Sequence, residues 1–256
     1  MSIQSYLKSL FVDVPRRLGY SKIVPCSITR DDFFAHYFSL KQHPFVLQLG
    51  ANDGKTYDPL YAHMSTHAVT GLLVEPLHDV FLRLQSNYQH NPNIQCANVA
   101  IEENDGDVTF YRIRPDLVLP GNEYKASSGS SFYRTDVIEN VKNRLPPKRK
   151  NVLKYISNDP NEYIEEVRVK ALTLATLCKQ YAVGQIDFVL IDCQGFDYQI
   201  LKQFDFTKFS PDIINYEHCL LNASDLKKSR ELLVQNGYQY FVHGGDTCAY
   251  KLRTVA

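Results

Sequence analysis

The sequence predicts an α/β fold with a mostly parallel sheet and a C-terminal antiparallel pair of strands. Short apolar runs that are typical of buried strands alternate with segments of helical period along most of the chain. Polar and acidic residues directly follow several of these runs. The last two runs flank the turn sequence His243-Gly244-Gly245-Asp246, which predicts that they pair with each other.

Length and composition indicate one large globular domain. The chain has 256 residues, of which 44% are hydrophobic and 22% are charged. Lys and Arg together number 28, as do Asp and Glu, and this balance argues against a dedicated nucleic-acid binder. No signal peptide is evident, and no run approaches the roughly 18 apolar residues that span a bilayer. We therefore expect a cytoplasmic protein without a membrane partner.

The first half of the chain should supply three neighbouring strands. Residues 1–43 are expected to form a helical lead-in, whose helix begins near Asp31 with Thr29 or Asp31 as its N-cap. The main domain is expected over residues 44–256. Its first half is predicted to contain strand Phe45–Leu49, helix Asp58–Ser65, strand Thr70–Val74, helix Leu77–Tyr88 and strand Ile94–Val99.

The middle of the chain is predicted to be an insertion. Alternating residues over Val108–Ile113 predict an added strand. Residues 114–165 are rich in Pro, Gly and Ser, and only Asp136–Arg144 resembles a helix there. Because long irregular segments inside compact domains usually serve a function, we expect a lid or substrate-binding segment.

The second half should complete the sheet. Strand Ile186–Asp192 gives the strongest apolar signal in the chain. The other predicted elements are strand Glu165–Ala171, helix Leu172–Tyr181, helix Phe196–Phe204, strand Ile213–Tyr216, helix Asp225–Gln235 and the terminal strands Tyr238–Val242 and Thr247–Leu252.

A loop after the first strand has the features of a cofactor site. Gly50 permits a sharp turn at the strand end, and Gly54 permits the backbone to approach a ligand. The second strand ends at Glu75, about 20 residues later, where Rossmann-like sheets place a carboxylate against ribose hydroxyls. The loop is not GxGxxG, and its few glycines favour S-adenosylmethionine over a dinucleotide. An ordinary Asn/Asp/Gly turn is the alternative interpretation.

Acidic residues stand at four predicted strand ends, Asp53, Glu75, Asp192 and Glu217. A carboxylate in a buried position costs desolvation energy unless it is paired, so this pattern predicts a site for a cationic, hydroxyl-rich ligand. The candidates for a general base on the same edge are Asp192, Glu217, His218 and His243. Alternatively, Asp192 binds cofactor, and the two histidines are structural.

The order of these motifs resembles the FkbM-type methyltransferases. The chain contains, in this order, the motifs GANDG and LLVEP, a serine-rich segment at residues 127–131, and the motifs IDFVLIDCQGFD and INYEH. The resemblance spans roughly residues 44–252. It implies a class I methyltransferase (Rossmann-like) fold with S-adenosylmethionine as cofactor. The resemblance implies cofactor contacts for Gly50, Ala51, Asn52, Gly54, Glu75, Asn98, Ala100, Ser130 and Ser131, and functional roles for the acids Asp192 and Glu217. Together with the positions at the sheet edge, we predict Asp192, Glu217 and His218 as catalytic residues, and Asp53 and Asp192 as further cofactor-binding residues.

One position departs from the family pattern. The family's IDxEGxE motif appears here as IDCQGFD, so Gln194 replaces a glutamate and one carboxylate is missing. A hard cation such as Mg²⁺ is held by several oxygen ligands, and we therefore predict no metal site.

The favoured function is methyl transfer to a hydroxyl of a sugar or natural-product intermediate. A second hypothesis is N-methylation of a peptide or amide that enters the 114–165 segment. A third is a cofactor-binding module without catalysis, and a dehydrogenase is disfavoured by the absent GxGxxG. The run Lys148-Arg149-Lys150 is either a solvated loop or a contact for an anionic substrate.

Overall fold

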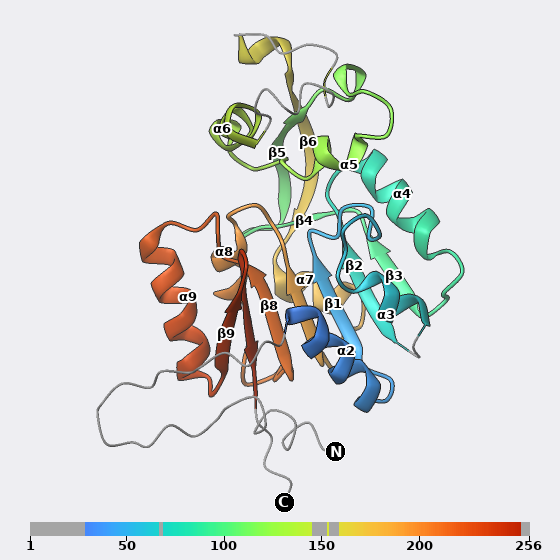
Figure 1. Ribbon diagram of the computed structural model, residues 1–256, viewed down its shortest axis with the longest axis vertical. Coiled ribbons are helices and arrows are strands. Elements are labelled where there is room, and N and C mark those ends of the chain that lie inside the picture. Colours follow the sequence, from blue (N-terminus) through green and yellow to red (C-terminus); the bar gives the residue numbers. More distant parts are fainter. Residues whose placement is uncertain (1–28, 67–68, 145–152, 154–158, 252–256) are drawn as a thin grey trace, which may run out of the picture.

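The computed structural model describes residues 29–66, 69–144, 153 and 159–251. Its main sheet has seven strands in the order β3-β2-β1-β7-β8-β10-β9, with helices on both faces (Figure 1). Only β10 runs antiparallel to its neighbours β8 and β9. This confirms the predicted α/β fold with a C-terminal antiparallel pair. Among the described helices, none is long and apolar enough to cross a membrane.

The centre of the main sheet consists of short buried strands. Strand β1 (Phe45–Leu49) lies between β2 (Thr70–Val74) and β7 (Phe188–Ile191) and is parallel to both. Every residue of β7 is buried, as expected for a parallel strand covered on both faces. The remaining strands are β3 (Ile94–Ala97), β8 (Ile213–Glu217), β9 (Gln239–His243) and β10 (Asp246–Tyr250).

Two apolar cores lie on the two faces of this sheet. Because side chains alternate along a strand, Val46 and Leu47 of β1 belong to different cores. The packed helices are α2 (Arg30–Leu40), α3 (Tyr61–Thr66), α4 (His78–Tyr88), α7 (Leu174–Gln180), α8 (Asp197–Leu201) and α9 (Ala223–Gln235).

Helix α2 is the described part of the predicted lead-in, and it packs on the sheet. Thr29 is its N-cap and forms a capping box with Asp32, which confirms one of the two predicted caps. Four aromatic residues of α2 are buried: Phe33, Phe34, Tyr37 and Phe38.

A second sheet rises above the C-terminal edge of the main one. Strand β5 (Gly106–Ile113) pairs along its whole length with β6 (Ile164–Leu172), which also pairs with β4 (Ala100–Ile101). Both long strands were predicted, but β6 belongs to this sheet and not to the main one. In Figure 1 the β5–β6 ribbon projects from the main sheet.

The described part of the insertion is more ordered than the sequence predicts. It contains η2 (Pro115–Leu117), α5 (Glu123–Ser127), α6 (Arg134–Arg144) and η4 (Pro160–Glu162). These elements enclose a separate apolar cluster that includes Val137, Val141 and Ile164. The prediction of a largely structureless segment is therefore wrong here, whereas Lys148-Arg149-Lys150 lies outside the described residues.

Several predicted boundaries differ by a few residues, and two of them differ for local reasons. The helix expected from Asp58 begins at Tyr61, because the Asp58 carboxylate accepts hydrogen bonds from the backbone N–H groups of Leu60 and Tyr61. Strand β3 ends at Ala97 and not at Val99, because the chain then crosses to β4 in the second sheet.

Candidate functional site

A cavity lies at the carboxyl ends of β1, β2 and β7, where the fold brings several predicted site residues together. Its volume is about 100 Å³. The predicted site residues that line this cavity are Gly50, Ala51, Asn52, Glu75, Ala100, Ser130 and Asp192. We refer to it as the strand-end cavity.

The loop after β1 forms the floor of this cavity. Gly50 has φ +78° and Asn52 has φ +49°, both in the left-handed region. A Cβ on Gly50 would lie 2.0 Å from the carbonyl oxygen of Asp192, so only glycine fits between the two strand ends. The N–H groups of Gly50 and Ala51 both donate to the carbonyl of Val74, at 3.1 and 2.9 Å, which fixes the loop on β2.

Glu75 connects that loop to the start of α4. Its carboxylate accepts hydrogen bonds from the N–H groups of Asn52 (3.0 Å) and Leu77 (2.9 Å). Burial raises its pKa to about 7, although those two N–H groups and the nearby charge of Arg112 lower it. Glu75 is thus a buried acid that lines the cavity and titrates near neutrality.

Two cavity residues, Gln48 and Asp58, were not predicted. The amide nitrogen of Gln48 donates to the Asp58 carboxylate at 2.5 Å. The Gln48 Oε1 atom is buried, and it has no hydrogen-bond partner among the described residues. Burial raises the pKa of Asp58. The signal available in the sequence was a polar residue inside the apolar strand Phe45–Leu49, because such a residue must point at a partner.

Asp192 and Glu217 are joined by Gln194. The Gln194 amide nitrogen donates to Asp192 Oδ1 at 3.0 Å and to Glu217 Oε2 at 3.3 Å. Asp192 and Gln194 line the strand-end cavity, whereas Glu217 is outside its lining. The side chain that replaces the family's glutamate therefore places a neutral donor between two carboxylates. Among the described residues, no group of three or more His, Cys, Asp or Glu side chains is arranged to hold a metal ion.

Asp197 is the third acid of this region and is fully buried. Burial raises its pKa well above the usual range, and the charges of Asp192 and Glu217 raise it further. Its Oδ1 accepts the N–H of Glu217 at 3.2 Å. Asp197 is thus a buried acid whose charged form is disfavoured by burial and by the two other acids.

Four predicted cofactor residues, Asp53, Gly54, Asn98 and Ser131, have local structural contacts and do not line the strand-end cavity. The Ser131 hydroxyl donates to the Asp136 carboxylate at 2.7 Å. Asp53 accepts hydrogen bonds from the N–H groups of Lys55 and Thr56. Gly54 faces α4, where an added Cβ would lie 2.4 Å from Leu84. The absent side chain thus makes room for helix packing. The Asn98 amide donates to the carbonyls of Glu75 and Pro76, both at 2.9 Å, and so supports the turn after β2.

The two predicted histidines lie further along the edge. His218 Nδ1 is 3.1 Å from the Thr247 hydroxyl, and burial lowers the His218 pKa. His243 ends β9. Neither ring is part of the lining of the strand-end cavity.

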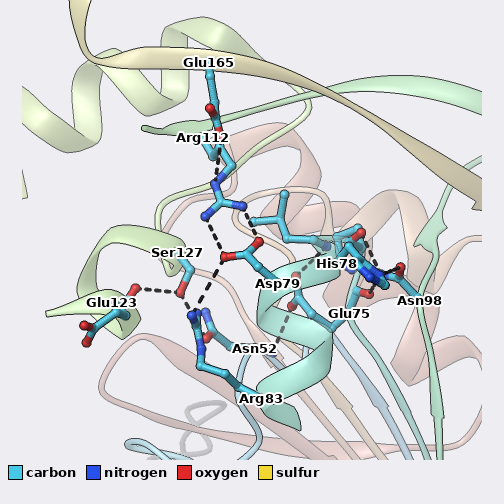
Figure 2. Close-up of polar contacts among 12 residues, drawn as sticks. Asn52, Glu75, His78, Asp79, Arg83, Asn98, Arg112, Glu123, Ser127 and Glu165 are labelled. Carbon is cyan, nitrogen blue, oxygen red and sulfur yellow. Dashed lines mark hydrogen bonds and ion pairs between the residues drawn. The ribbon is translucent and has the colours of Figure 1, made fainter. Parts of the chain in front are cut away.

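Polar contacts join the insertion and the second sheet to the core (Figure 2). The Ser127 hydroxyl of α5 lies 3.1 Å from Asn52 Oδ1. Above them, the Tyr124 ring of α5 contacts the Tyr57 ring, with centroids 5.5 Å apart. Both tyrosines line the cavity. Helix α5 therefore forms part of the cavity wall.

The second contact is an ion pair between the second sheet and helix α4. Arg112 of β5 is buried and donates from both terminal nitrogens to Asp79 of α4, one contact measuring 3.0 Å. Its Nε atom lies 3.4 Å from Glu165 Oε1 of β6. Figure 2 shows Arg112 between these acids, above Glu75. A bidentate pair of this kind fixes orientation as well as distance.

The sequence model of the FkbM methyltransferase domain matches residues 48–240, which is most of the chain. The chain belongs to the FkbM methyltransferase family. It is therefore an S-adenosylmethionine-dependent methyltransferase, as the motif order predicts. No protein with curated annotation matches it.

Solved structures resemble this FkbM methyltransferase in fold. An FkbM methyltransferase from Methylobacillus flagellatus KT shares 14% identity at a TM-score of 0.44, over 81% of this chain and 43% of that one. A precorrin-6y C5,15-methyltransferase from Geobacter metallireducens GS-15 shares 11% sequence identity at a TM-score of 0.42, over 88% of this chain and 91% of that one. Aeropyrum pernix fibrillarin with bound S-adenosylmethionine shares 11% sequence identity at a TM-score of 0.39, over 83% of this chain and 67% of that one.

The strand-end cavity of this FkbM methyltransferase suits S-adenosylmethionine chemically. Its wall near β4 is apolar and includes Val99, Ala100, Ile101 and Phe110, as an adenine ring requires. Glu75 offers a carboxylate to ribose hydroxyls. The unpartnered Gln48 Oε1 is an acceptor for an ammonium group.

Proposed function

We propose that this enzyme transfers a methyl group from S-adenosylmethionine to a hydroxyl oxygen of a sugar or natural-product intermediate. The observation that carries the proposal is the position of Asp192. This acid lines the strand-end cavity and is held by Gln194 beside a second carboxylate, Glu217. A hydroxyl must lose its proton as it attacks a methyl group, and a carboxylate within hydrogen-bond reach accepts that proton.

The cofactor would be held by residues of the strand-end cavity. Glu75 would accept hydrogen bonds from the ribose hydroxyls, and Ala100 and its neighbours would contact the adenine. Gln48 Oε1 and the Asp58 carboxylate would receive the ammonium of the methionyl part. When bound, S-adenosylmethionine supplies an electrophilic methyl group on a positively charged sulfur. These contacts orient the methyl group, and such pre-alignment is worth up to about 7–11 kcal/mol.

Asp192 accepts the proton of the acceptor hydroxyl, and Gln194 keeps its carboxylate oriented. The neutral amide stabilises the negative charges of Asp192 and Glu217 without adding a charge of its own. Burial and the charges of Asp192 and Glu217 raise the pKa of Asp197, which disfavours a further negative charge at this edge. A general base of this kind contributes about 10²–10⁴-fold to the rate.

The cover over the cavity must move for the cofactor to enter. A volume of about 100 Å³ is below the roughly 300–1,000 Å³ of most ligand sites. Helix α5, with Tyr124 and Ser127, forms this cover. We propose that α5 opens during cofactor exchange and closes to exclude water during transfer.

The test supplies S-adenosylmethionine carrying a trideuterated methyl group, together with a small-molecule extract, and follows labelled products by mass spectrometry. Wild type should label a hydroxylated compound, and Asp192→Asn should do so at least about 10²-fold more slowly. Calorimetry with S-adenosylhomocysteine controls for binding. Unchanged turnover in Asp192→Asn would refute its role as base, and label on nitrogen would establish N-methylation instead. Tight binding without any labelled product would favour the non-catalytic module.

A further inference from the structure

A second cavity lies on the far side of the serine-rich segment, and its volume is about 330 Å³. One wall comes from the insertion, through Ser131, Tyr133 and helix α6. The other comes from the loops after β7 and β8, through Gln194, Gly195 and Leu220. Its volume is within the usual range for small-molecule sites, without any movement of the chain.

This cavity borders the strand-end cavity along residues 128–131. Ser128 and Ser130 line the strand-end cavity, whereas Gly129 and Ser131 line the second one. Ser128 and Gly129 form a turn after α5, so one short stretch of backbone contributes to both cavities.

Gln194 is the other shared boundary, because it lines both cavities. Its amide is hydrogen-bonded to Asp192 and Glu217, the two acids at the edge of the sheet. A molecule in the second cavity therefore lies next to Gln194, and Gln194 also borders the strand-end cavity, where Asp192 lies.

The lining of the second cavity defines the class of ligand. Asp136 and Glu139 of α6 supply carboxylates, and Asn140 and Asn222 supply amides, which are groups that bind hydroxyls. Tyr133 is 57% exposed and offers a ring face for an apolar sugar surface. The described lining has two carboxylates and no lysine or arginine, so these described residues favour a neutral or cationic group over an anionic one.

We propose that the second cavity is the acceptor site and that it takes a neutral or cationic polyol, such as a sugar or amino sugar, and not a phosphorylated one. The proposal rests on the proposed methyl transfer, because it names the acceptor of that reaction. It also predicts that cofactor and acceptor enter through separate openings on the two sides of the serine-rich segment.

The test is saturation-transfer difference NMR on protein loaded with S-adenosylhomocysteine. The probes are glucosamine, glucose and glucose 6-phosphate, which share a ring and differ in charge. Saturation of ring protons is expected for the first two and not for the phosphate. Tyr133→Ala should weaken sugar binding about tenfold, and Glu139→Gln should weaken glucosamine binding more than glucose binding. Glu231→Gln, which removes a charge from α9 outside both linings, should change nothing.

The outcomes separate the two proposals. Calorimetry with S-adenosylhomocysteine on the same variants reports the strand-end cavity alone, and the affinity should be unchanged. Absence of ring saturation by both glucose and glucosamine would overturn the acceptor assignment, as would preferred binding of the phosphate. Sugar binding that persists in Tyr133→Ala and Glu139→Gln would place the acceptor elsewhere. Loss of S-adenosylhomocysteine binding by wild type would instead refute the proposed function.

Discussion

The side-chain amide of Gln194 donates a hydrogen bond of 3.0 Å to the carboxylate of Asp192. The same nitrogen reaches Glu217 at 3.3 Å, and the Gln194 backbone is in the left-handed region with φ +52°. A strained backbone position that aims one amide at two acids indicates a functional arrangement. The glutamine thus provides hydrogen bonds at the position where the family's usual glutamate provides a negative charge.

Gln194→Glu should therefore slow methyl transfer about 10²-fold in the absence of divalent cations, because a third carboxylate repels Asp192 and Glu217 and donates nothing to them. Added Mg²⁺ should partly restore the rate of this variant, since three carboxylates can hold a hard cation. Steady-state rates with Mg²⁺ and with EDTA check this. Gln199→Glu on α8 is the matched control. Loss of wild-type activity in EDTA, with recovery in Mg²⁺, would contradict the metal-free reading of the site.

Glu75 should make stability depend on pH. Its pKa is about 7 in the folded protein and 4.5 as the reference value, so the folded state holds the proton more tightly between these values. The free energy of unfolding therefore falls as pH rises through this window. Between pH 5 and pH 8 the free energy of unfolding should fall by about 2 kcal/mol in wild type. The Glu75→Gln variant should not show this fall. Urea unfolding of both proteins at the two pH values measures the difference. Parallel pH curves would show that Glu75 titrates normally.

The Arg112–Asp79 pair should couple the insertion to the core. Arg112 is nearly buried but Asp79 is 46% exposed, so solvent screens the pair and the expected coupling is about 1 kcal/mol. A double-mutant cycle with Arg112→Met and Asp79→Ala measures it by chemical unfolding. The exposed pair Lys227–Glu231 on α9 should give a coupling near zero. Equal coupling energies for the two pairs would contradict the claim that Arg112 orients β5 over α4.

Tyr124→Ala should accelerate both association and dissociation of S-adenosylhomocysteine, because it removes the ring that contacts Tyr57 above the strand-end cavity. Stopped-flow fluorescence measures the two rates, and an increase of about tenfold in each is expected for the loss of one aromatic contact. Tyr133→Ala, on the same insertion but outside this cavity, is the control. Identical association rates in wild type and Tyr124→Ala would mean that α5 does not gate entry.

Much of the fold followed from local pattern. Short apolar strands such as Phe188–Ile191 need burial on both faces, and this requirement predicted the central parallel sheet. Strand β6 was also predicted, but alternation of Val167 and Val169 with charged residues states only that one face is buried. The alternation does not indicate which sheet the strand joins, because its pairing with β5 depends on residues far away in the sequence.

The site was predictable where a strand end imposes the geometry. Gly50 and Glu75 were predicted because the turn and the strand length fix their positions. Gln48 and Asp58 were not, because one appeared to be an ordinary strand residue and the other to start a helix. The second cavity depends on how α6 packs over the loops after β7 and β8, and no local signal in the sequence reports such packing.

The most direct test of the account is the affinity of S-adenosylhomocysteine for wild type and Glu75→Gln, measured by calorimetry at pH 8. Loss of the charge-assisted hydrogen bonds to ribose should weaken binding roughly 10- to 100-fold, while Glu231→Gln should bind like wild type. NAD should not bind to any of the three proteins. Equal affinity of wild type and Glu75→Gln, or binding of NAD in place of S-adenosylhomocysteine, would contradict the assignment of the strand-end cavity as the cofactor site.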